Sequence, residues 1–140
     1  MRKRSVAREC ALQILYQFEM NDQLLEEAKS AFWQESPPAS EEIRTFAELL
    51  VNGTISHIKE IDQAIVKAAK NWLIHRMASI DRNILRFATY ELLFLKDVPP
   101  KVTINEAVNI AKKYSQEDSG KFVNGILDNI THAIDKPIES

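Results

Sequence analysis

The chain has 140 residues, of which 45% are hydrophobic and 27% are charged, a composition typical of a single globular domain. Three glycines are too few for a turn-rich β fold, and no apolar run approaches the roughly 18 residues of a membrane span. The formal net charge of −2 does not by itself indicate a nucleic-acid partner, so evidence for one must come from how the charges are distributed.

Helical periodicity extends along nearly the whole chain, and no segment alternates with the period of a strand for long enough to predict one. Two proline pairs, Pro37–Pro38 and Pro99–Pro100, each predict the end of one helix and the start of the next. We therefore expect an all-α protein with about seven helices in two fused helical-bundle lobes. The lobes are predicted to cover about 1–70 and 71–140 of a single domain spanning 1–140. The predicted helices cover residues 3–20, 22–34, 40–57, 59–70, 73–96, 101–114 and 116–135.

The start of the first predicted helix is basic. The first eight residues carry four positive charges, which leaves the rest of the chain at −6, four charge units below the −2 of the whole. A concentrated basic end on an acidic body can bind phosphate groups locally, although such a run can also be a solvated tail without a partner. The four residues are Arg2, Lys3, Arg4 and Arg8.

The two faces of the first helix differ in character. One apolar stripe predicts a core face that includes the single cysteine, Cys10, whose lone thiol excludes an intramolecular disulfide and is typical of a cytoplasmic protein. On the other side, Arg8, Leu12 and Tyr16 form a row at helical spacing. Because basic groups bind phosphate and aromatic rings stack on unpaired bases, this row favours an RNA-binding face; alternatively, Leu12 and Tyr16 pack on a neighbouring helix. The core stripe consists of Val6, Ala7, Cys10, Ala11, Ile14, Leu15 and Phe18.

The helix predicted over 73–96 carries a carboxylate in the centre of its apolar face. Because a buried carboxylate must be paired or protonated, we expect Glu91 to make a structural hydrogen bond or ion pair. Arg82 and Arg86 are expected on the opposite, exposed side of the same helix. The core face is predicted to contain Leu73, Met77, Ile80, Ile84, Phe87, Ala88 and Leu95.

The last predicted helix contains Asn124 and Gly125, a pair typical of turns, within a continuous apolar stripe. Gly125 lies on the side away from that stripe, where glycine costs about 1 kcal/mol of helix stability relative to alanine. A bare backbone at this point would let another helix or a ligand approach closely. Lys121 and Phe122 form a second basic–aromatic pair near the predicted helix N-terminus, where an anion is favoured. The helix start is predicted from a capping box over 115–118.

Residues with catalytic or metal-binding spacing are not evident in the sequence. The three histidines are scattered, and there is no P-loop, GxGxxG, GxSxG or HExxH motif. Cys10 lies in an apolar stripe, which is a poor environment for a nucleophile. We therefore expect a protein that is not an enzyme and that needs no cofactor and no metal.

Four segments carry a resemblance to a known family. They are ARECALQILYQ at 7–17, DRNILRFATYEL at 81–92, VPPKVTINEAVNIAKKYS at 98–115 and EDSGKFVNGILDNI at 117–130. With these segments in this order, the chain resembles the bacterial transcription antitermination factors of the NusB family. The resemblance covers essentially the whole chain, except that 21–60 matches only in helical character, and it implies an all-helical fold with two bundled lobes.

The resemblance also implies a function and partners. Members of the family bind the boxA element of nascent RNA together with NusE, a small-subunit ribosomal protein. The complex joins the elongating RNA polymerase with other Nus factors and supports read-through of terminators, chiefly in ribosomal RNA operons. By this resemblance, the protein is expected to be a cytoplasmic, non-enzymatic RNA-binding antitermination factor without a membrane segment.

Site residues follow from matching positions in the family's motifs. The acid that opens the long-helix motif, linked in the family to the NusE side, corresponds to Asp81. Asp81, Leu85 and Leu92 also form one row on the flank of that helix, where a partner protein or a wide core could cover them. Asp81 and Leu85 are therefore the predicted partner-binding residues. The predicted RNA-binding residues are Arg2, Lys3, Arg4, Arg8, Tyr16, Asp118, Lys121 and Phe122.

Two alternatives from other classes stay open. The chain could be a protein-only helical adaptor without RNA binding, or a helper domain related to ribosomal RNA cytosine methyltransferases, to which similar helical domains are fused. A chain of 140 residues that is already filled by helices leaves no room for a methyl-donor-binding domain, which argues against an enzyme.

Overall fold

The computed structural model describes residues 2–70 and 72–139, with side chains up to residue 134. In these residues, seven α-helices and one short 3₁₀ helix follow one another and there is no strand, which confirms the predicted all-α fold. The elements are α1 (Lys3–Met20), α2 (Leu25–Glu35), α3 (Glu41–Ser56), α4 (Ile58–Ala69), η1 (Ile74–Arg76), α5 (Ser79–Phe94), α6 (Pro100–Tyr114) and α7 (Ser119–Glu139).

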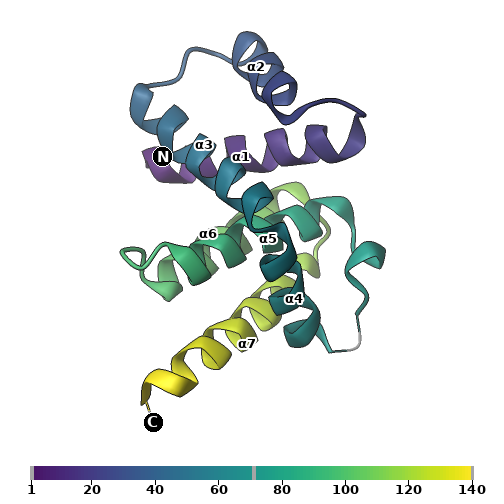
Figure 1. Cartoon of the computed structure of the whole chain (residues 1–140), viewed down its shortest axis with the longest axis vertical. Helices are drawn as coiled ribbons and strands as arrows, with labels where there is room; N and C mark the ends of the chain where they lie inside the picture. The colour runs from purple at the N-terminus through teal and green to yellow at the C-terminus, as the bar shows by residue number, and fades with distance from the viewer. Residues whose placement is uncertain (1, 71, 140) are drawn as a thin grey trace.

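Helix α5 lies in the middle of the fold and packs against α1, α3, α4, α6 and α7. Helix α1 also packs on α2 and α3, whereas α6 and α7 pack on each other. Figure 1 shows α1 and α2 at one end of the molecule and the C-terminal end of α7 at the other. One buried cluster has members from every α-helix and so joins the N-terminal and C-terminal helices. The predicted division into two lobes near residue 70 therefore stays a prediction.

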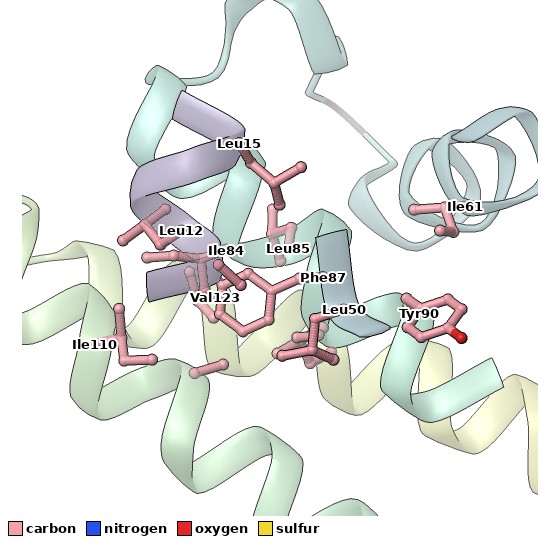
Figure 2. Packing of buried hydrophobic residues seen from close by; sticks show 14 of the residues in the cluster. Leu12, Leu15, Leu50, Ile61, Ile84, Leu85, Phe87, Tyr90, Ile110 and Val123 are labelled. Carbon is pink, nitrogen blue, oxygen red and sulfur yellow. The ribbon is translucent and has the colours of Figure 1, made fainter. Parts of the chain in front are cut away.

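The core is built on the apolar face of α5. Ile84 and Phe87 are fully buried, as their helical spacing predicts. Figure 2 shows these two side chains among Leu12 of α1, Leu50 of α3 and Val123 of α7. Full burial of a side chain of this size contributes about 1.5–3 kcal/mol. The same cluster therefore fixes α1 and α7, which carry most of the predicted site residues, relative to α5.

The helix predicted over 73–96 begins only with α5, and Leu73, expected in the core, is exposed. The side chain of Arg82 provides a reason. Its guanidinium donates hydrogen bonds to the carbonyl oxygens of Ile74 (3.3 Å) and Met77 (2.8 Å), so these groups are satisfied without a continuous helix. Such a contact leaves no mark in the apolar periodicity from which the longer helix was predicted.

The exposed positions expected for Arg82 and Arg86 are wrong, because both arginines are partly buried in ion pairs. Arg86 donates two hydrogen bonds of 2.9 Å to the carboxylate of Asp62 in α4, and both arginines pair with Glu19 in α1. Burial alone would raise the pKa of Glu19, but hydrogen bonds from Arg82 and Ser79 and the two positive charges lower it below its ordinary value. These ion pairs connect α1, α4 and α5.

A close crossing of α3 and α5 occurs at Gly53, a residue for which the sequence predicted no special role. The ring of Tyr90 lies against the bare backbone of Gly53, so a Cβ atom built there would lie 2.1 Å from Cζ of the ring. Tyr90 also stacks on Phe94, with 5.4 Å between ring centroids. A larger residue at Gly53 must therefore displace a ring that is held by its own neighbours.

Candidate nucleic-acid interface

The basic N-terminal residues lie at the start of α1 and not in a loose tail. Arg2 precedes the helix in extended backbone, Lys3 and Arg4 begin it, and all three are exposed. The ammonium group of Lys3 lies 3.2 Å from the carboxylate of Glu42, and the guanidinium of Arg4 lies 4.4 Å from the centre of the Phe46 ring. Because exposed contacts of this kind are weak, the three charges remain available to phosphate groups.

Arg8, expected on an exposed RNA-binding face, is only 2% exposed. Its guanidinium donates two hydrogen bonds of 2.8 Å to the carboxylate of Glu91 and one of 3.3 Å to Glu106. Glu91 is fully buried and also accepts a bond of 2.9 Å from Thr103. Burial alone would lower the pKa of Arg8, but the bonds and charges of Glu91 and Glu106 raise it. The prediction for Glu91 is confirmed, and the expected exposure of Arg8 is wrong because its donors are occupied inside the protein.

The other two residues of that row, Leu12 and Tyr16, differ in burial. Leu12 is buried in the core, as in the alternative interpretation, whereas Tyr16 on the next turn is 39% exposed. Helix α1 packs against α2, α3 and α5, so most of its circumference is covered. Tyr16 is therefore the member of the row that reaches the surface, and its contact with RNA stays a prediction.

The start of α7 presents a second set of predicted residues. Asp118 directly precedes the helix, and both Asp118 and Lys121 are exposed. Phe122 is partly buried and packs edge-to-face against Trp72, with 5.3 Å between ring centroids. Trp72 is 53% exposed and is missing from the predicted site. The signal that could have found it is a tryptophan in a predicted linker between two helices.

Gly125 lies on the exposed side of α7, three residues after Phe122. Apart from its own helix, the described part of the chain places no heavy atom within 4 Å of the position that a Cβ atom would occupy. Of the two explanations for this glycine, a close helix crossing is therefore wrong within the described chain. Close approach of a ligand stays a prediction.

The predicted partner-binding residues do not lie on an exposed flank. Leu85 is fully buried in the core, and Asp81 is only 8% exposed. The carboxylate of Asp81 accepts hydrogen bonds from Ser115 (2.7 Å) and Ser119 (3.0 Å), at the end of α6 and the start of α7. The wide core thus covers this row, and the partner-binding prediction is corrected. The capping box predicted at Ser115 is also wrong, because its hydroxyl binds Asp81 and α7 begins at Ser119.

The described residues offer neither a metal site nor a membrane-spanning helix. No group of three or more His, Cys, Asp or Glu side chains is placed to hold a metal ion, and no helix there is both long and apolar enough to cross a membrane. A groove of about 980 Å³ lies between α4 and the second half of α7, lined in part by Val66 and Ala133. None of the predicted site residues borders this groove.

This fold and surface define a class: all-helical proteins, packed around one central helix, that carry basic and aromatic side chains at the surface of α1 and at the start of α7. Residues 5–132 match the sequence profile of the NusB family. The chain is 47% identical over 138 residues to the transcription antitermination protein NusB of Desulfitobacterium hafniense, a match that covers 97% of this chain and 93% of that protein. The chain therefore belongs to the NusB family.

Solved structures agree with this assignment. The structure of NusB from T. maritima has a TM-score of 0.85 and 38% sequence identity, and the match covers 100% of this chain and 99% of that one. A crystal structure of antitermination factors NusB and NusE in complex with double-stranded RNA has a chain with a TM-score of 0.87 and 34% identity. That match covers 95% of this chain and 98% of the other.

Proposed function

We propose that this protein is a non-enzymatic, RNA-binding transcription antitermination factor that acts in the cytoplasm with a NusE-type ribosomal protein. Its RNA ligand is the boxA element of nascent transcripts. The complex supports processive elongation by RNA polymerase, together with other Nus factors, through ribosomal RNA operons. The names of the relatives and the complex of NusB, NusE and double-stranded RNA support the class of function and the two partners.

The pair of exposed Lys121 and partly buried Phe122 at the start of α7 is the observation that carries the RNA-binding proposal. The backbone N–H groups of the first helical turn favour an anion, and Lys121 adds a full positive charge next to them. Phe122 offers an aromatic ring to a base, and the exposed carboxylate of Asp118 can accept a hydrogen bond from a base amino group. At Gly125 no side chain obstructs the surface beyond Phe122.

Helix α1 supplies the second part of the proposed surface. Arg2, Lys3 and Arg4 are exposed and would contact phosphates, which strengthens binding irrespective of sequence. Tyr16 would stack on a base. Arg8 does not belong to this set, because its charge is already paired with Glu91.

Tyr16→Ala is expected to weaken RNA binding by roughly five- to 150-fold, because one stacked base contributes about 1–3 kcal/mol. Its melting temperature should stay near that of the wild type, since the side chain is 39% exposed. Phe122→Leu should weaken binding by a similar factor while retaining an apolar contact with Trp72. Fluorescence anisotropy with a labelled single-stranded boxA RNA measures both affinities.

Tyr16→Phe is the matched control, because it keeps the ring and removes only the hydroxyl group. It should bind RNA as the wild type does. If Tyr16→Ala and Phe122→Leu both keep full affinity, neither ring contacts RNA and the proposed surface is wrong.

A further inference from the structure

The last turn of α6 carries a basic–aromatic pair that is not among the predicted RNA-binding residues. The ammonium group of Lys113 lies 5.2 Å from the centre of the Tyr114 ring. Lys113 also donates hydrogen bonds to both carboxylate oxygens of Glu9 in α1, at 3.1 and 3.3 Å. The Tyr114 hydroxyl donates to the same carboxylate. The Lys113 side chain is nevertheless 52% exposed, so its charge faces solvent.

This pair lies between the two parts of the proposed RNA surface. Through Glu9 it contacts α1, and Tyr16 follows Glu9 by two turns on the same face of that helix. The hydroxyl oxygen of the next residue, Ser115, lies 2.9 Å from that of Ser119, the first residue of α7, and both hydroxyls donate to Asp81. Phe122 follows Ser119 by one turn. An RNA strand that contacts both Tyr16 and Phe122 would therefore pass the end of α6.

We propose that Lys113 binds a phosphate of the RNA backbone at this crossing, and that Glu9 weakens the contact by competing for the ammonium group. This inference rests on the RNA-binding function proposed above and adds a contact between its two parts. A carboxylate that already binds the lysine must give up part of that interaction when a phosphate arrives, and it repels the phosphate as well. Lys113 thus contributes affinity, whereas Glu9 limits it.

The two residues are expected to act in opposite directions. In single-stranded RNA, each phosphate contact accounts for about 0.7 in the slope of log affinity against log salt, which corresponds to about fivefold in affinity at 0.1 M salt. Lys113→Ala should therefore lower the affinity about fivefold and reduce the slope by about 0.7, equally for boxA and scrambled RNA. Glu9→Gln should raise the affinity for both RNAs, because glutamine still accepts a bond from Tyr114 but carries no charge.

Full-length variants are titrated with both single strands at several salt concentrations. Lys101→Ala is the matched control, since Lys101 is an exposed lysine at the opposite end of α6, and it should leave affinity and slope unchanged. Melting temperatures are recorded for each variant. A loss of affinity in Lys113→Ala with a wild-type melting temperature supports a direct contact.

Tyr16→Ala separates this inference from the proposed function. If Tyr16→Ala loses affinity while Lys113→Ala matches the Lys101→Ala control, the inference fails and the proposed function stands. If the wild-type protein binds neither RNA, both fail. A lower affinity in Glu9→Gln would contradict the proposed competition between Glu9 and phosphate for Lys113, because it would show that the carboxylate supports the RNA contact.

Discussion

Arg8→Met is expected to destabilise the protein by about 3–5 kcal/mol, because it leaves the Glu91 carboxylate buried without its guanidinium partner. Glu91 is fully buried. Of the side-chain hydrogen bonds described above, the substitution leaves its carboxylate only the one from Thr103. Urea denaturation followed by circular dichroism measures the change in the free energy of unfolding. At low temperature, the folded fraction should keep the salt slope of RNA binding, since Arg8 is already paired within the protein.

Arg4→Met is the matched control, with the same substitution one turn earlier on an exposed side chain. It should change stability by less than about 1 kcal/mol, the size of an exposed cation–π contact. It should also lower RNA affinity about fivefold at 0.1 M salt. The double variant Arg8→Met/Glu91→Leu removes both buried charges and should recover much of the lost stability. Near-normal stability of Arg8→Met with a reduced salt slope would contradict the buried pair.

Gly53→Ala is expected to destabilise the protein by about 1–3 kcal/mol, the usual cost of overpacking a core. Helix propensity alone predicts the opposite, a gain of up to about 1 kcal/mol. The steric effect should prevail because the new Cβ atom would lie 2.1 Å from Cζ of Tyr90, whose ring is held against Phe94. Thermal and urea denaturation both measure the result.

Gly125→Ala is the control for Gly53→Ala, because it is the same substitution in another helix with open space at the Cβ position. It should stabilise the protein by up to about 1 kcal/mol. A gain of the same size in Gly53→Ala would contradict the close crossing of α3 and α5. RNA titration of Gly125→Ala tests the remaining role of this glycine: a weaker complex indicates close approach of RNA, and unchanged affinity excludes it.

The core could be predicted from the sequence because burial on a helix follows its 3.6-residue spacing. Ile84 and Phe87 are buried where the periodicity places them. The position of Glu91 within that face also predicted that the carboxylate must be paired. Its partner could not be predicted, because Arg8 lies 83 residues earlier and only the folded chain brings the two together.

Predictions of exposure were right where one helix alone decides it. Lys121 lies on the outer side of α7 and is exposed as expected. They failed where neighbouring helices cover both sides of a helix, as at Arg8, since a helical wheel does not show what packs on the other side. Asp81 was misplaced for the same reason, because the turn between α6 and α7 covers it and supplies two hydroxyl donors.

A filter-binding titration of the wild-type protein tests the central claim most directly. The ligands are single-stranded boxA RNA, a scrambled strand of equal composition and a boxA duplex, each with and without NusE. We expect the single-stranded boxA RNA to bind more tightly than the scrambled strand, and more tightly than the duplex because stacking on Tyr16 and Phe122 requires unpaired bases. We also expect NusE to increase the affinity for boxA. Equal binding of boxA and scrambled RNA, unaffected by NusE, would contradict the proposed function.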